Sequence, residues 1–215
     1  PELRGHGKSG HADPYRVVDY ARDIIAFLRH LGEPVTLVGF SLGALTALAV
    51  AAQYPAGVHH LVIIDPPLGV RHQSPDAPPD GVPYFSWVYE TLKAAPSRDE
   101  LFARVRALQP ANTPEPQLWR QVDQLSGLAV GTVGTMLEGR MPEDFDMAQA
   151  FRQLACPTLL IYGDADFGAA MSDADADFAR SNLPSIQVVK IPQTGHLIPM
   201  EHAAFTVEHI IPMIS

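Results

Sequence analysis

A glycine–x–serine–x–glycine pentapeptide, Gly39 to Gly43, lies between an apolar run and an alanine-rich run. The apolar residues Val35 to Val38 are typical of a short buried strand, and residues 42–54 are typical of a helix. A strand that turns sharply into a helix crowds its own backbone, so we expect side chains at positions 39 and 43 to collide with it. The pattern predicts a strand–turn–helix unit with the Ser41 hydroxyl raised above a helix-covered sheet.

Strand and helix patterns alternate in both the N-terminal and the C-terminal parts of the chain. A helix is predicted from about Pro14 to Leu31, because Asp13 can cap its start and Gly32 suits its end. Further strands are predicted at 60–64, 158–162 and 186–191, and further helices at about 172–182 and 199–213. This alternation predicts an α/β fold with a mostly parallel, doubly wound sheet.

The middle of the chain has a different character. From 66 to 150, prolines recur, helical patterns dominate and no strand pattern appears. We interpret this stretch as a helical cap insertion, with residues 1–65 and 151–215 forming the α/β core. The chain has 215 residues, 47% of them hydrophobic, which is enough for one sizeable core.

A serine hydroxyl needs a histidine to accept its proton before it becomes a good nucleophile. His196 follows Gly195 in the loop after the strand at 186–191, so it lies just beyond the carboxyl end of a predicted parallel strand. Open α/β sheets place their functional sites at that edge. We therefore predict that Ser41 is the nucleophile and that His196 is its base.

The histidine in turn needs an acid that fixes its tautomer. Asp166 follows the strand at 158–162, and it gives the chain order Ser, Asp, His that is expected when a nucleophile turn of this kind lies in an α/β sheet. Asp164 is an alternative, although an aspartate directly after a glycine often forms the turn itself. Asp65, which closes the strand at 60–64, is the runner-up. We predict that Asp166 is the acid.

Other residues are expected to stabilise or contact a substrate. The backbone N–H of Leu42 begins the helix after the serine and would stabilise an oxyanion. Phe40 and Leu197 adjoin the two reacting side chains in sequence, and Trp87 and Trp119 are the tryptophans of the insertion. We predict that these four line an apolar substrate pocket, the alternative being that the insertion's aromatic residues form its own core.

Together these segments resemble the α/β-hydrolase superfamily, in particular its small capped members. Residues 2–9 resemble the D-x-R-G-x-G-x-S loop of that family, with Glu2 in place of the aspartate. Residues 39–43 match its nucleophile turn, and residues 195–196 match its histidine loop. In the family the carboxylate lies three residues after the glycine of the acid-bearing strand, which favours Asp166 over Asp164.

The resemblance implies hydrolysis through an acyl-serine, with no organic cofactor and no metal. We expect a carboxylic ester of a small apolar or aromatic molecule to be the substrate. The alternatives are cleavage of a carbon–carbon bond in a ring-cleavage diketone, and a cofactor-free haloperoxidase or perhydrolase activity. A catalytically silent ligand-binding protein is an alternative of another class. The serine argues against the dehalogenase and epoxide-hydrolase branches, which carry aspartate at this position.

The resemblance also implies three strands and a helix before residue 1, roughly 50 to 60 residues at typical element lengths. The strand at 35–38 would then present a bare edge, which is prone to aggregation. The second oxyanion donor of the family would be missing from the chain. We therefore expect a preceding segment or a complementary chain to supply these parts.

Charge and cysteine content restrict the classes of partner and the cellular compartment that we expect. The formal net charge of -9 disfavours nucleic acid and anionic membranes, so a small molecule is the expected partner. No apolar run approaches the roughly 20 residues of a membrane helix. The single cysteine, Cys156, fits a reducing compartment, and we expect a cytoplasmic location.

Overall fold

The computed structural model describes residues 1–69, 82–94 and 96–214, and these residues form two compact units. The helical unit comprises Pro1–Arg16 and Pro78–Met141, and the core unit comprises Val17–Ala77 and Pro142–Ser215. The parts of the expected insertion at 70–81 and at 95 lie outside the described residues.

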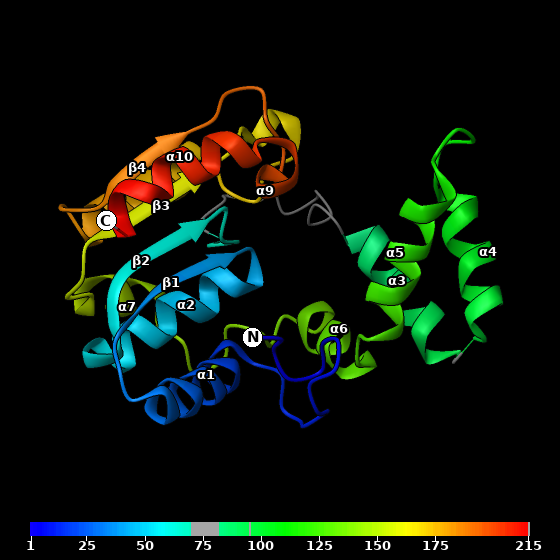
Figure 1. Ribbon diagram of the computed structural model, residues 1–215, viewed down its shortest axis with the longest axis horizontal. Helices are drawn as coiled ribbons and strands as arrows, with labels where there is room; N and C mark the ends of the chain where they lie inside the picture. The colour runs from blue at the N-terminus through cyan, green and yellow to red at the C-terminus, as the bar shows by residue number, and fades with distance from the viewer. Residues whose placement is uncertain (70–81, 95, 215) are drawn as a thin grey trace. The chain divides into compact units, whose positions relative to one another are not determined.

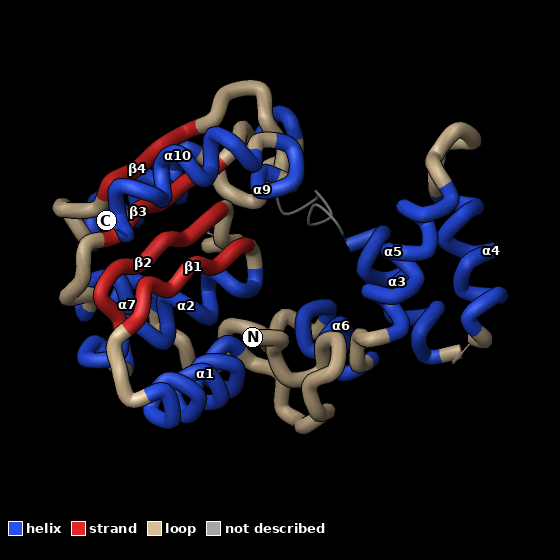
Figure 2. Tube along the Cα trace, viewed as in Figure 1, coloured by secondary structure: helices blue, strands red, loops and turns tan. Residues whose placement is uncertain are grey.

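The core unit contains a four-stranded parallel sheet in the order β1-β2-β3-β4 (Figure 2). Its strands are β1 (Val35–Phe40), β2 (Val58–Ile64), β3 (Thr158–Tyr162) and β4 (Gln187–Lys190). The first, second and third strands pair so that Val38, Val62 and Leu159 form one row across the sheet. The predicted α/β class is confirmed.

Helices cover both faces of this sheet (Figure 1). On one face, Phe205 and Ile210 of the last helix pack against apolar side chains of β2 and β3. On the other face, the helix after β1 packs on β1 and β2. The helices of the core unit are α1 (Val17–Leu31), α2 (Leu42–Gln53), α7 (Met147–Gln153), α8 (Asp173–Asn182), α9 (Ile198–Glu201) and α10 (Ala203–Ile214).

Two predicted helices differ from those observed. The helix expected from Pro14 begins at Val17, and the residues before it group with the helical unit. The helix expected at 199–213 is two helices, α9 and α10. They are separated at His202, whose φ of -128 and ψ of 43 are not helical.

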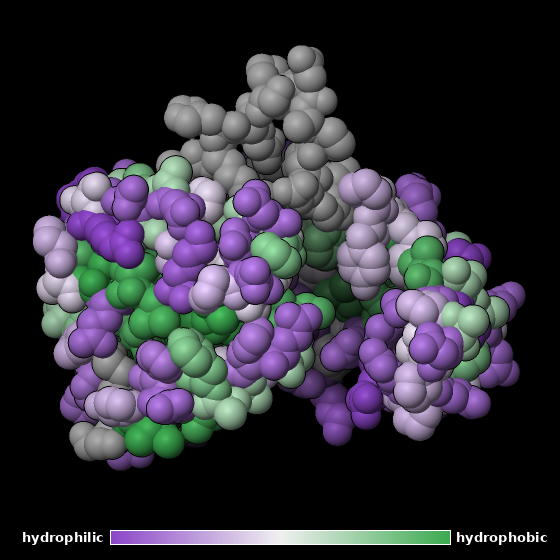
Figure 3. Space-filling model, turned by 90° about the horizontal axis from the view of Figure 1, so that it is seen from above, coloured by the Kyte–Doolittle hydropathy of each residue, from purple (hydrophilic) through white to green (hydrophobic). Residues whose placement is uncertain are grey.

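The first strand lies at the edge of the sheet within the described part of the chain. Val38 is 48% exposed, whereas Val62 in the same row is fully buried. Apolar side chains also remain at the surface of the core unit (Figure 3). Val207 and Ile211 of α10 are each about half exposed. The edge position of β1 agrees with the sequence analysis, and the segment expected to cover it stays a prediction.

The described insertion residues form helices and loops without a strand (Figure 2). Its helices are α3 (Val82–Lys93), α4 (Arg98–Leu108), α5 (Glu115–Ser126) and α6 (Val130–Leu137). They enclose an apolar cluster of their own around Leu101, Val122 and Val133.

The helical unit also contains residues 1–16, which the sequence analysis assigned to the core. The Ala129 N–H donates to the carbonyl oxygen of Gly5 at 2.8 Å. A methyl group added at Gly5 would lie 2.6 Å from the side chains of both Tyr15 and Thr132. The opening segment is therefore packed tightly against α6 and the turn before it.

None of the helices described here combines the length and the apolar character required to cross a bilayer.

Candidate active site

Ser41 occupies the turn between β1 and α2. Its backbone has φ 53 and ψ -120, a positive-φ conformation that is costly for a residue with a side chain. The Ser41 N–H donates to the carbonyl oxygen of Ile64 at 2.9 Å, and the Ser41 carbonyl accepts from the Ala44 N–H at 2.9 Å. The hydroxyl does not cap the helix. Backbone hydrogen bonds thus hold Ser41 in this strained conformation, and its hydroxyl remains available for contacts outside the helix.

The two glycines of the pentapeptide have different surroundings. A methyl group added at Gly39 would lie 2.2 Å from the carbonyl oxygen of Gly43, so the predicted collision at position 39 is confirmed. At Gly43 an added methyl group would meet nothing within 4 Å among the described residues. The predicted collision at position 43 is wrong, because the first turn of α2 faces open space there.

His196 lies next to Ser41, as the sequence analysis predicts. Its Nε2 atom is 2.9 Å from the Ser41 Oγ atom. The His196 carbonyl accepts from the Ile198 N–H at 2.9 Å, and the Phe40 ring packs beside the imidazole with centroids 4.8 Å apart. The imidazole is therefore within hydrogen-bond reach of the serine hydroxyl, as a general base must be.

Asp65, not Asp166, is the carboxylate that binds His196. The Asp65 Oδ2 atom lies 2.6 Å from His196 Nδ1. Asp65 directly follows β2, is fully buried and has φ 43. Its carboxylate also accepts from the Ala170 N–H at 2.7 Å and from the Met171 N–H at 3.1 Å. A buried carboxylate is tolerated only when such donors satisfy its oxygens.

The prediction of Asp166 as the acid is therefore wrong. After β3 the chain forms a short 3-10 helix, Ala165–Phe167, which leaves Asp166 exposed. Asp164 accepts from the Asp166 N–H, so it forms the turn as the sequence analysis expected of it. The signal that favours Asp65 was present in the sequence: it ends a wholly apolar run, where a carboxylate must be buried and so must have partners.

Leu42 begins α2 directly after the serine. Across the described residues, its backbone N–H has no hydrogen-bond acceptor. The positive end of the helix macrodipole lies at the same place. The structure thus places a donor where the sequence analysis expected one, and a second donor is not assigned among the described residues.

The four predicted pocket residues have different environments. Phe40 contacts the imidazole, and Leu197 is 47% exposed beside it in sequence. Trp119 stacks on Phe102, with centroids 4.3 Å apart, inside the helical unit. Trp87 also packs against the apolar cluster of that unit. The alternative interpretation, an insertion core, accounts for both tryptophans.

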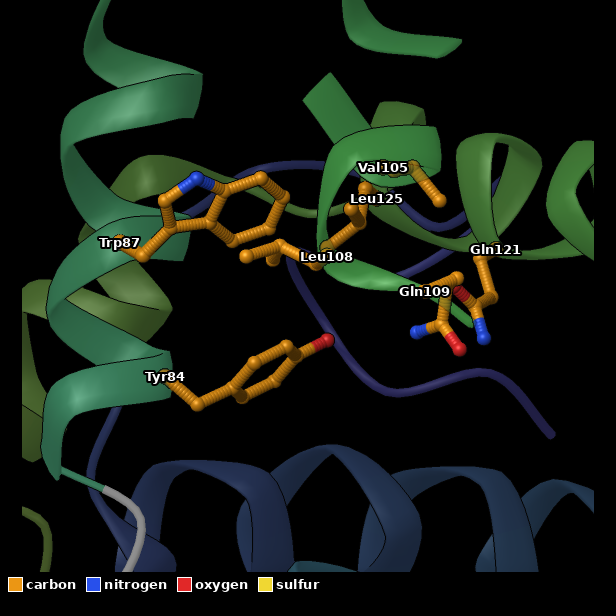
Figure 4. Close-up of a pocket in the computed structure, with 7 residues that line it drawn as sticks. All are labelled: Tyr84, Trp87, Val105, Leu108, Gln109, Gln121 and Leu125. Atoms are coloured by element: carbon orange, nitrogen blue, oxygen red, sulfur yellow. The ribbon is translucent and has the colours of Figure 1, made fainter. Parts of the chain in front are cut away.

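Trp87 also lines a small pocket within the helical unit (Figure 4). Figure 4 shows Trp87 and Tyr84 projecting from α3, with two glutamine side chains at the opposite end of the pocket. Burial raises the pKa of the Tyr84 hydroxyl, so it stays neutral. The remaining lining residues are Val105, Leu108, Gln109, Gln121 and Leu125.

Metal-ligating side chains and the cysteine thiol are the other groups that could carry chemistry. Among the described residues, no three His, Cys, Asp or Glu side chains are grouped so that they could hold a metal ion. Burial raises the pKa of the Cys156 thiol, which disfavours the nucleophilic thiolate.

Comparison with known proteins assigns the family. The family model described as "Alpha/beta hydrolase family" matches residues 1–209. The chain belongs to this family. This family member thus combines the expected fold with a serine, a histidine and a buried aspartate in hydrogen-bond contact.

Two curated relatives match this family member over most of its length. One is the 2-(acetamidomethylene)succinate hydrolase of Mesorhizobium japonicum, 28% identical over 92% of this chain and 70% of that protein. The other is the N-formylmaleamate deformylase of Pseudomonas putida, 29% identical over 93% of this chain and 72% of that protein.

Other similarities are shorter or structural. A probable alcohol acetyltransferase of Wickerhamomyces anomalus is 42% identical over 65 residues, 30% of this chain and only 19% of that protein. A solved thermophilic esterase from Thermogutta terrifontis superposes with a TM-score of 0.67 and 25% identity, covering 100% of this chain and 78% of its own.

Proposed function

We propose that this family member hydrolyses an acyl compound through a covalent acyl-serine. The observation that carries the proposal is the continuous contact from the Ser41 hydroxyl through the His196 imidazole to the Asp65 carboxylate. The hydrogen bond to Asp65 favours a proton on Nδ1 of His196, which leaves the Nε2 lone pair facing the serine. This tautomer is the one that a general base needs.

The proposed reaction has two halves. Ser41 Oγ attacks the acyl carbon while its proton passes to His196 Nε2, and the carbonyl electron pair moves to oxygen, where the Leu42 N–H donates to it. The oxyanion then collapses, the bond to the leaving group breaks, and the leaving group takes the proton from Nε2. Water repeats the sequence on the acyl-serine and releases the acid.

An ester of a small apolar or aromatic molecule is the first substrate class that we propose. The similarity to a solved esterase supports it. The Phe40 ring beside the imidazole adds an apolar surface next to the reacting groups.

Hydrolysis of an N-acyl bond is the second candidate. The two relatives that match over most of this chain carry the names of an acetamidomethylene-compound hydrolase and an N-formyl-compound deformylase. The same three residues would serve, since His196 can protonate a departing nitrogen as it protonates an alkoxide.

A fluorophosphonate probe tests the proposal. We expect stoichiometric labelling of Ser41, and no labelling of a folded Ser41→Ala variant. Chromogenic esters of graded acyl length, N-formyl and N-acetyl amides, and a vinylogous diketone would then identify the bond that is cleaved. A folded protein that neither reacts with the probe nor turns over any substrate would overturn the proposal and favour a silent ligand-binding protein.

A further inference from the structure

A hydrogen bond between two side chains links the two ends of the segment that carries His196. The Nε2 atom of His202 lies 2.9 Å from the Oγ1 atom of Thr194, two residues before His196. Thr194 is 2% exposed, so the bridge ends in the interior of the core unit. It joins the start of the histidine loop to the junction between α9 and α10.

The donors and acceptors of this bridge can be assigned. The Thr194 hydroxyl lies 3.2 Å from the carbonyl oxygen of Pro192, to which it donates. A hydroxyl has only one hydrogen, so its oxygen must accept from His202 for both bonds to form. In the arrangement that satisfies both bonds, His202 carries a hydrogen on Nε2 and acts as the donor.

Thr194 packs tightly against the loop that follows β3. Its carbonyl oxygen accepts from the Asp164 N–H at 2.7 Å. A methyl group added at Gly163 would lie 2.3 Å from that same oxygen, and one at Gly195 would lie 2.6 Å from the carbonyl oxygen of Phe167. Backbone packs directly on backbone here, so a shift of Thr194 has to move its neighbours, including His196.

The other end of the bridge is also fixed. The His202 N–H donates to the Ile198 carbonyl at 2.8 Å, and the His202 carbonyl accepts from both the N–H and the hydroxyl of Thr206 at 2.9 Å each. Ile198 itself is fully buried. The backbone of His202 is thus held on both sides, which limits the positions that its imidazole can adopt.

We propose that His202 is a positioning residue for His196, acting through the Thr194 hydroxyl. The inference rests on the proposed function of His196 as the base. His202 takes no part in the reaction at Ser41. It holds the loop in the conformation that keeps Nε2 of His196 within hydrogen-bond distance of the serine hydroxyl. Displacing a reacting group by about 1 Å can lower a rate on the order of a hundredfold.

The test compares His202→Ala with His202→Gln, since a glutamine amide can still donate to Thr194. We expect His202→Ala to lower kcat for a chromogenic ester roughly tenfold to a hundredfold, with KM within about twofold. His202→Gln should recover most of the loss. Thr194→Val should reproduce the defect of His202→Ala, and Thr194→Ser should not.

His209→Ala is the matched control. His209 stacks on Phe205, with centroids 4.0 Å apart, and bonds the Phe205 carbonyl on α10, so it is a structural histidine of the same region. It should lower the melting temperature and leave kcat unchanged. Equal losses of kcat in His209→Ala and His202→Ala, or a normal kcat in His202→Ala, would overturn the proposal.

The labelling rate of Ser41 by the fluorophosphonate separates this inference from the proposed function. If wild-type protein is labelled at Ser41 and the folded His202 and Thr194 variants are labelled equally fast, only the role of His202 is refuted. If wild-type protein is not labelled, the proposed function fails first. Should His202→Ala not fold, Thr194→Val against Thr194→Ser decides the question.

Discussion

Two neighbouring strands of the sheet are followed by aspartates, and only one of these segments supplies the site carboxylate. Asp65 after β2 is fully buried and binds His196, whereas Asp166 after β3 is exposed. Both lie at the same edge of a parallel sheet. The comparison teaches that the position after a strand does not select the acid; a buried setting with donors for both oxygens does.

The two strand ends nevertheless act together. The loop after β3 contributes the Ala170 and Met171 N–H groups that bind the carboxylate of Asp65. One end therefore carries the charge, and the other carries the donors that make its burial possible. A negative charge held in this way also favours the imidazolium that forms when His196 takes a proton.

The largest expected effect follows removal of the buried charge. Asp65→Asn keeps the size of the side chain but favours the wrong tautomer of His196, so kcat should fall on the order of ten-thousandfold. Steady-state kinetics with a chromogenic ester measures this fall, and circular dichroism shows whether the variant is folded.

Asp166→Asn is the matched control for that substitution. Because Asp166 is exposed and Asp65 already bonds Nδ1 of His196, kcat should stay within about twofold of wild type. A greater loss from Asp166→Asn than from Asp65→Asn would reverse the comparison of the two strand ends.

An intermediate effect is expected where the loop after β3 packs on the histidine loop. In Gly163→Ala the new methyl group would lie 2.3 Å from the carbonyl oxygen of Thr194, so the backbone must shift. Such overpacking lowers the free energy of unfolding by about 1–3 kcal/mol, and kcat should fall as well because His196 moves. Urea unfolding and steady-state kinetics measure the two effects.

Gly43→Ala provides the comparison, since an added methyl group there meets nothing within 4 Å among the described residues. Its urea midpoint should equal or exceed that of wild type. An unchanged urea midpoint in Gly163→Ala would show that the two loops are not tightly coupled.

The smallest effect is expected from the polar contacts that Asp173, at the start of α8, makes with β3 and β4. Hydrogen bonds from Lys190 and from the Tyr162 hydroxyl lower the pKa of Asp173. A lowered pKa stabilises the folded state above the unfolded pKa of about 3.9, and the stabilisation is lost as the pH falls through the lower folded value. Because the Asp173 side chain is 69% exposed, the effect is small.

Asp173→Asn tests the sign of this effect. The urea midpoint of wild type should exceed that of the variant slightly at pH 7, and the difference should vanish near pH 2 to 3. A difference that grows in acid would contradict the assignment of the lowered pKa.

The sequence predicts the strands, the nucleophile turn and the meeting of Ser41 with His196, because apolar runs and glycine spacing record local geometry. The choice of acid is different: it depends on the Ala170 and Met171 N–H groups, which lie more than 100 residues from Asp65. The grouping of residues 1–16 with the helical unit depends on packing around Gly5, which no periodic pattern records. The division of the last helix at His202, whose side chain contacts Thr194, is likewise not recorded in the apolar pattern.

The hydrogen bond from the Ser41 N–H to the Ile64 carbonyl has a consequence for stiffness. Ile64 directly precedes Asp65, whose own N–H donates to the Ile161 carbonyl of β3. The backbones of the nucleophile and the acid are therefore both hydrogen-bonded to the sheet, at the ends of two adjacent strands. The register of these strands sets the distance between them. His196, by contrast, lies in a loop beyond the last strand, so the position of its imidazole depends most on how that loop packs.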